Sequence, residues 1–103
     1  MNHVNLIGKV SSTPRIVETE NGRKIAQFTL TTKEMYLDAD GKSKSKNQWH
    51  RLTAWGKWVT ILQECCTEGM SLAIEGRINN KFYQIAGTKR FVSEIEINDL
   101  IIL

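Results

Sequence analysis

Only one stretch of this chain has the periodicity of an amphipathic helix, and this limits the fold more than any other feature. Within residues 57–67 the apolar side chains recur at helical spacing, namely Trp58, Ile61, Leu62 and Cys65. Gly69 follows in the position of a C-terminal cap. A parallel sheet needs a crossover helix for each connection, so a chain with one helix favours a small closed β-barrel.

Strand-like stretches surround the predicted helix on both sides. They cover residues 3–10, 15–20, 24–32, 47–55, 70–79 and 91–98. Asn21-Gly22 separates two of them and is typical of a two-residue type I′ hairpin turn. With 103 residues the chain suffices for one domain, residues 1–103. We predict an all-β fold: a five-stranded oligonucleotide-binding barrel with one helix between strands 3 and 4.

The alternation of side chains in the first strand separates two faces. Val4, Leu6 and Val10 lie on one face, which suits a core, while Asn5 and Ile7 lie on the other. Gly8 interrupts the row and indicates a bend or a close approach of another backbone. Because Ile7 is apolar, the second face is predicted to be only partly solvated and to be available for a subunit contact.

Residues 47–57, NQWHRLTAWGK, have the most unusual face in the sequence. Trp49, Arg51, Thr53 and Trp55 point to one side of an extended strand, and Leu52 with its neighbours points to the other. A row of rings with an arginine makes a poor core, because the guanidinium would lose its hydration. Unpaired bases could stack on such a row, and the arginine could hold a phosphate. An ordinary half-buried sheet face remains the alternative interpretation.

Residues 33–48 are more polar than the stretches on either side. Lys42, Lys44 and Lys46 alternate with serines after the turn-forming Asp38–Gly41 region. This stretch is predicted to be either a solvated hairpin loop or a movable cationic arm that follows a phosphate backbone.

Composition favours a globular domain without a membrane segment. Hydrophobic residues make up 41% and charged residues 24% of the chain, and the net charge is only +3. Any polyanion must therefore meet a local basic patch. The N-terminus lacks a signal-peptide pattern and no apolar stretch reaches about 20 residues, so a cytoplasmic protein is expected. Cys65 and Cys66 are adjacent, and we expect both to be reduced helix residues.

The order of several motifs resembles the DNA-binding domain of bacterial single-stranded DNA-binding proteins over nearly the whole chain. The matching motifs are VNLIGKV, TPRI, NGRKIAQFTLTT, QWHRLTAWGK, the helix and GMSLAIEGRI. This resemblance implies a barrel that coats single-stranded DNA during replication, recombination or repair. It also implies a homo-oligomer, with a tetramer favoured over a dimer, that needs no cofactor or metal and acts in the bacterial cytoplasm or nucleoid.

The resemblance assigns roles to individual side chains. It places Trp49 at a base-stacking tryptophan, Trp55 where the family usually has phenylalanine, and Met35 where a stacking tryptophan is common. Tyr83 shares another tryptophan position with Phe82. The expected phosphate contacts are Arg51, Arg77, Lys42, Lys44 and Lys46.

The same resemblance places His50 at a subunit contact, to which we add Ile7 and Asn5 from the first strand. The family's flexible tail with an acidic tip has no counterpart before Leu103; recruitment of replication proteins through such a tail is therefore doubtful if the sequence is the complete protein, and nothing follows if it is part of a longer one.

Two other function classes compete with DNA coating. An enzyme is disfavoured, because His3, His50 and the two cysteines lack metal-ligand spacing and no phosphate-binding glycine loop occurs. Glu94 and Glu96 share a strand face and are expected to form a solvated edge. The second alternative is a dimer that resembles primosomal replication protein B and acts mainly as a protein-interaction and replication-restart module.

Overall fold

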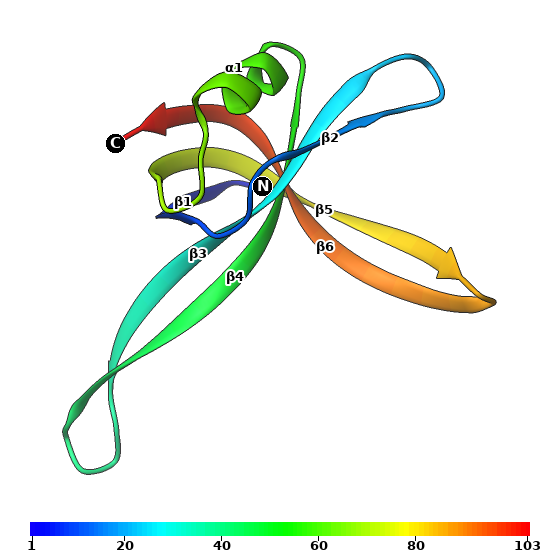
Figure 1. Cartoon of the computed structure of the whole chain (residues 1–103). Coiled ribbons are helices and arrows are strands. Elements are labelled where there is room, and N and C mark those ends of the chain that lie inside the picture. The colour runs from blue at the N-terminus through cyan, green and yellow to red at the C-terminus, as the bar shows by residue number, and fades with distance from the viewer.

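The structure is a computed structural model that describes the backbone of all 103 residues and all side chains except those of Tyr83, Gln84 and Ile85. The elements are β1 (Val4–Val10), β2 (Arg15–Glu18), β3 (Lys24–Leu37), β4 (Ser43–Trp55), α1 (Lys57–Cys65), β5 (Ser71–Ile85) and β6 (Thr88–Ile102). In the sheet they follow the order β1-β5-β6-β4-β3-β2, and β1 also pairs with β3. Five strands thus close into a barrel with α1 between the third and fourth of them, which confirms the predicted fold (Figure 1).

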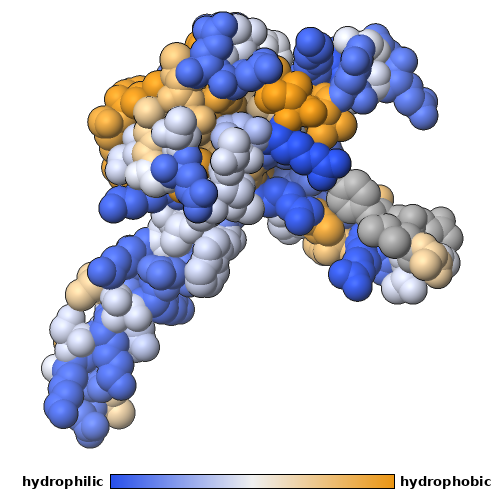
Figure 2. Space-filling view, in the orientation of Figure 1, coloured by the Kyte–Doolittle hydropathy of each residue, from blue (hydrophilic) through white to orange (hydrophobic). Residues whose placement is uncertain are grey.

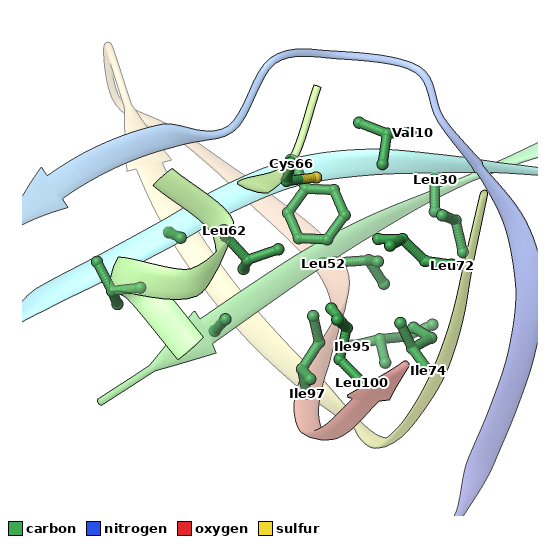
Figure 3. Packing of buried hydrophobic residues seen from close by; sticks show 14 residues of the cluster. Val10, Leu30, Leu52, Leu62, Cys66, Leu72, Ile74, Ile95, Ile97 and Leu100 are labelled. Atoms are coloured by element: carbon green, nitrogen blue, oxygen red, sulfur yellow. The ribbon is translucent and has the colours of Figure 1, made fainter. Parts of the chain in front are cut away.

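The barrel interior is filled by the apolar faces that alternation predicts. Leu52 and Ala54 of β4 are fully buried, and Val10 of β1 is buried as well. The helix α1 adds Val59 and Leu62 to the same cluster. Figure 3 shows these side chains meeting between the strands and α1. The hydrophobic effect, acting on this one cluster, therefore holds the barrel and the helix together.

The helix ends earlier than its periodicity predicts. Cys66 has an extended backbone and caps α1 through its N–H, which donates to the Leu62 carbonyl. Gly69, with a φ of +90°, belongs to the following turn, where its N–H donates to the Val10 carbonyl at 2.8 Å. The prediction that both cysteines belong to the helix is therefore wrong for Cys66. Both cysteines are free, as expected. Burial of Cys66 raises the pKa of its thiol. No helix in the described part of the chain is long and apolar enough to cross a membrane.

Two long β-ribbons project from the barrel (Figure 1). In the first, β3 and β4 stay paired from Ile25 opposite Trp55 to Leu37 opposite Ser43. The expectation that residues 33–48 form a loop is therefore wrong, because only residues 38–42 lie outside the two strands. In the second ribbon, β5 and β6 are paired as far as the turn at Ala86-Gly87.

The hairpin turn at Asn21-Gly22 is not of the predicted type. The turn at Asn21-Gly22 exists, but only Gly22 has a positive φ, and its N–H donates to the Thr19 carbonyl at 2.9 Å. A type I′ turn requires a positive φ at both central residues, so the predicted type is wrong here. Two consecutive residues with positive φ occur instead in the β5–β6 turn, where φ is 51° at Ala86 and 80° at Gly87.

Asp38 organises the turn of the β3–β4 ribbon. Its Oδ1 accepts hydrogen bonds from the Lys42 N–H at 2.9 Å and the Asp40 N–H at 3.0 Å. The Lys42 N–H, together with the Lys44 ammonium, holds the pKa of the Asp38 carboxyl below its usual range. The carboxylate therefore stays ionised at neutral pH and fixes the turn.

Two glycines allow strands to approach closely. A Cβ on Gly8 would overlap the Thr31 carbonyl oxygen, where β1 passes from β5 to β3. This confirms the close approach that the sequence indicates at Gly8. A Cβ on Gly76 would overlap the Glu96 carbonyl oxygen beside the β-bulge at Glu75/Gly76. Both positions lie where the barrel must close.

Candidate nucleic-acid interface

The predicted row on β4 lies on the outer face of the barrel but is not continuously exposed. Trp49 is 67% exposed and Arg51 is also exposed, whereas Thr53 is completely buried and Trp55 is half-buried. The alternation of the strand is therefore as predicted. The row is not a continuous surface for stacking, because the buried Thr53 separates the exposed Trp49 from the half-buried Trp55.

The strand β6 covers Thr53. It runs parallel to β4, with Thr53 opposite Glu96 and Leu52 opposite Ile95. The Thr53 hydroxyl donates to Glu94 Oε2 at 3.1 Å, and Lys81 Nζ lies 3.5 Å from the same oxygen. The expectation that Glu94 belongs to a solvated edge is therefore wrong, since this residue is only 1% exposed. A buried carboxylate requires such hydrogen-bonding and cationic partners.

A groove of about 510 Å³ adjoins the exposed end of the row. It contains three arginines from three different strands, Arg15, Arg51 and Arg90. Among the side chains that the structure describes, no carboxylate forms an ion pair with any of them. The remaining lining residues are Ser12, Gln27, Phe28, Thr29, Val92 and Glu94. Three guanidinium groups for which the described side chains provide no ion pair, near the exposed Trp49 on the same strand face, can bind phosphates next to stacked bases.

The sequence analysis did not identify Arg15 and Arg90 as site residues. Arg15 lies opposite Gln27 in the β2–β3 pair, and Gln27 lies opposite Thr53 in the β3–β4 pair. Residues directly opposite in antiparallel strands share a face. The predicted hairpin at Asn21-Gly22 could therefore have indicated that Arg15 lies on the same face as the β4 row. Arg90 carried no such signal, because only the fold of the β5–β6 ribbon brings it to this groove.

Trp55 is less available than Trp49 for stacking. The Arg23 guanidinium lies 5.2 Å from the centroid of the Trp55 ring, which is the geometry of a cation–π contact. A hollow lined by Arg23, Trp55 and Val59 lies beside the ring. A base that stacks on the covered face of Trp55 must first displace Arg23.

The β3–β4 ribbon presents different residues on its two faces. Met35 is exposed and shares the face of Trp49, as the assignment from the family requires, and Lys33 lies between them on β3. Lys44 and Lys46 alternate onto the opposite face. The predicted lysine arm is thus part of a paired ribbon, and Figure 2 shows its largely hydrophilic surface.

The lysines of this ribbon are partly neutralised. Lys44 Nζ lies 3.3 Å from Asp38 Oδ2, and Lys46 Nζ lies 3.8 Å from Glu34 Oε2. Lys42 lies in the turn next to them. Exposed ion pairs of this kind are weak because solvent screens them, so these ammonium groups can exchange a carboxylate for a phosphate.

The β5–β6 ribbon carries the remaining predicted contacts. Arg77 lies on the outer face of β5 and forms an ion pair with Glu96, at 2.9 Å from Nη2 to Oε2. The side chain of Tyr83 lies outside the described residues, although its backbone pairs with Arg90. Phe82 is exposed and contacts Phe91, with 5.1 Å between ring centroids. By alternation Phe82 lies on the ribbon face opposite that of Lys81 and the groove.

The residues predicted for a subunit contact do not share one face. His50 is half-buried on the inward side of β4, where its Nε2 lies 2.9 Å from the Thr32 hydroxyl. Ile7 is 70% exposed on the outward side of β1, and Asn5 is exposed beside it. Ile7 lies opposite Ala73, which lies opposite the exposed Ile101. An apolar row thus crosses the outer face of β1, β5 and β6.

Comparisons with known proteins place the chain among single-strand binding proteins. The family model described as "Single-strand binding protein family" matches residues 1–103. Single-stranded DNA-binding protein 1 of Chlorobaculum tepidum is 33% identical over 102 residues, covering 97% of this chain and 63% of the relative. The single-stranded DNA-binding protein of Xylella fastidiosa is 33% identical over 101 residues, with 97% and 62% covered. The chain therefore spans somewhat less than two thirds of these relatives.

Solved structures resemble the fold just described. A complex of the Plasmodium falciparum protein with single-stranded DNA has a TM-score of 0.90 and 29% identity, and the match covers 100% of this chain and 95% of that one. A deletion mutant of the single-stranded DNA binding protein from Thermus aquaticus has a TM-score of 0.88 and 21% identity, covering 100% of this chain and 50% of that one. At this identity the second likeness concerns the fold alone.

Proposed function

The chain belongs to the single-strand binding protein family, and we propose that it binds and protects single-stranded DNA during replication, recombination or repair. Residues 1–103 act as one single-stranded DNA-binding domain with no catalytic step. The observation that carries this proposal is the groove lined by Arg15, Arg51 and Arg90, with the exposed Trp49 two residues before Arg51 on the same face of β4. This arrangement supports base stacking together with phosphate neutralisation, a combination that tolerates any base sequence.

The proposed contacts differ in their accessibility. Trp49 and Met35 offer exposed stacking surface on one face, and Trp55 offers a ring that Arg23 partly covers. The three groove arginines supply phosphate contacts without breaking any ion pair among the described side chains, whereas Lys44 and Lys46 exchange a carboxylate partner. Tyr83 is kept as a proposed stacking residue from the family resemblance.

No specific observation favours the alternative of a dimer resembling primosomal replication protein B. The named relatives are single-stranded DNA-binding proteins, and one solved neighbour is titled as a complex with single-stranded DNA. We place the protein in the cytoplasm or nucleoid of a bacterium, in line with its two bacterial relatives.

Oligomerisation is part of the proposal. The row formed by Ile7, Ala73 and Ile101 gives the outer face of the barrel an exposed apolar strip that a second subunit could cover. We favour a homotetramer, with His50 at a second contact, because the family resemblance implies both. Replacement of Ile7 by aspartate is expected to lower the subunit count measured by analytical ultracentrifugation. A monomeric parent protein at micromolar concentration would contradict this part of the proposal.

The direct test of DNA binding is a titration with oligo(dT) while tryptophan fluorescence is followed. Quenching is expected with the single strand and not with duplex of equal length, because Trp49 needs an unpaired base on which to stack. Each phosphate neutralised on a single strand contributes about −0.7 to the slope of log K against log salt, so the three groove arginines predict a slope of about −2 or steeper. Absence of quenching at low salt would contradict the proposal and favour a protein-interaction module.

A further inference from the structure

Two carboxylates lie in the middle of the face that we propose for DNA. Glu94 and Glu96 project from β6 on the side of Thr53, between the levels of Arg51 and Trp55 on β4. Carboxylates repel a phosphate backbone unless they are neutralised. Their partners therefore determine how many cations of this face are available to DNA.

Glu96 is bound through both of its oxygens. Its Oε2 accepts a hydrogen bond from Arg77 Nε at 3.0 Å and lies 2.9 Å from Arg77 Nη2, and its Oε1 accepts a hydrogen bond from Asn79 Nδ2 at 2.7 Å. The Glu96 side chain is only 16% exposed, whereas that of Arg77 is 60% exposed. The arginine is thus accessible to solvent, but its charge is already matched.

The availability of Arg77 differs from that of the groove arginines. Arg51 and its two neighbours have no carboxylate partner among the described side chains. A phosphate that approaches Arg77 instead meets a guanidinium whose Nε and Nη2 already contact Glu96 and whose positive charge this carboxylate offsets. Displacing Arg77 would leave a largely buried carboxylate without its cation, which is strongly unfavourable.

We propose that Glu96 acts as an internal competitor of DNA phosphate and keeps Arg77 out of the phosphate-binding set. This role rests on the proposed function and adds a control on affinity to it. In the parent protein Arg77 contributes no counterion release, although it lies on the binding face. Glu96 thereby weakens binding to single strands and makes it less sensitive to salt.

The test compares Glu96→Gln, the double variant of Glu96→Gln with Arg77→Gln, and one control variant with the parent protein in oligo(dT) titrations over a range of salt concentrations. Glu96→Gln keeps the size and an oxygen acceptor of the side chain and frees the charge of Arg77. Its salt slope is expected to be steeper by about 0.7, which corresponds to about fivefold tighter binding at about 0.1 M salt. Glu64→Gln is the matched control, because this exposed residue on α1 loses the same charge far from Arg77 in the fold.

The double variant Arg77→Gln with Glu96→Gln locates the effect. It removes both charges of the ion pair and is expected to keep the parent slope. A slope shallower by about 0.7 in the double variant would overturn the proposal, since Arg77 would then already bind phosphate in the parent protein. Equal slopes for Glu96→Gln and Glu64→Gln would overturn it too.

The design separates this inference from the proposed function. If the parent protein binds oligo(dT) but the salt slopes of the variants differ from those expected, the proposed role of Glu96 is wrong and the proposed DNA binding is supported. If the parent protein does not quench with oligo(dT), the proposed function fails and the role of Glu96 falls with it. The slope of the double variant decides the question even if Glu96→Gln alone does not fold, which thermal melting would reveal.

Discussion

Replacement of Leu52 by alanine is expected to lower the free energy of unfolding by about 3–5 kcal/mol. Leu52 is completely buried at the junction of three strands, opposite Phe28 of β3 and Ile95 of β6. Truncation removes apolar contact with both neighbours and leaves a cavity that the closed barrel cannot collapse to fill. Because a domain of this size is stable by only about 5–15 kcal/mol, the loss is a large part of the total.

Chemical denaturation followed by circular dichroism measures this effect. Leu37→Ala is the matched control, because Leu37 stands at the end of β3 and is 72% exposed. The same substitution there should change stability by less than about 0.5 kcal/mol. Similar losses for both variants would mean that the inward face of β4 is not the core of the barrel.

The features that depend on local patterns were predictable. Alternation alone places Leu52 inward and Trp49 outward, and the structure has both as expected. Helical spacing locates α1 within two residues of its end, which is the usual uncertainty for a helix terminus. Each of these predictions needs only a segment of about ten residues and the geometry of one element.

The features that depend on distant pairing were not predictable. Thr53 is buried where β6 pairs beside it, and its hydrogen bond to Glu94 joins residues 41 positions apart. The position of Thr53 in the alternating strand does not predict its burial, since threonine is as suitable for an exposed strand face as for a buried one. Arg90 reaches the groove for the same reason, through the path of the β5–β6 ribbon.

The ribbon of β3 and β4 was missed because it lacks the usual signal for strands. Between Lys33 and Gln48 both faces are solvated, so the apolar alternation that marks a half-buried strand is absent. Its strands are held by continuous backbone pairing that extends from the barrel, and by the turn around Asp38. Pairing of this kind is set by the partner strand and not by the sequence of either strand alone.

Replacement of Trp49 by alanine is expected to weaken binding to oligo(dT) by about 1–3 kcal/mol, or roughly 5- to 150-fold, without changing the melting temperature. The indole is 67% exposed beside the arginine groove, so its removal deletes stacking area and leaves the core intact. Trp49→Phe keeps a flat ring and should retain most of the affinity. Trp55→Ala should cost less binding than Trp49→Ala, since Arg23 already covers part of that ring.

Fluorescence anisotropy with a labelled oligonucleotide, combined with thermal melting of each variant, distinguishes the two roles that Trp49 could have. Loss of binding at an unchanged melting temperature identifies Trp49 as a surface for bases. A lowered melting temperature would mean that the ring is covered in the folded protein, for instance by a second subunit, and that the outer face of β4 is an interface between chains. Unchanged binding and stability would move the stacking role to the β5–β6 ribbon, where Tyr83 and Phe82 would be the next residues to replace.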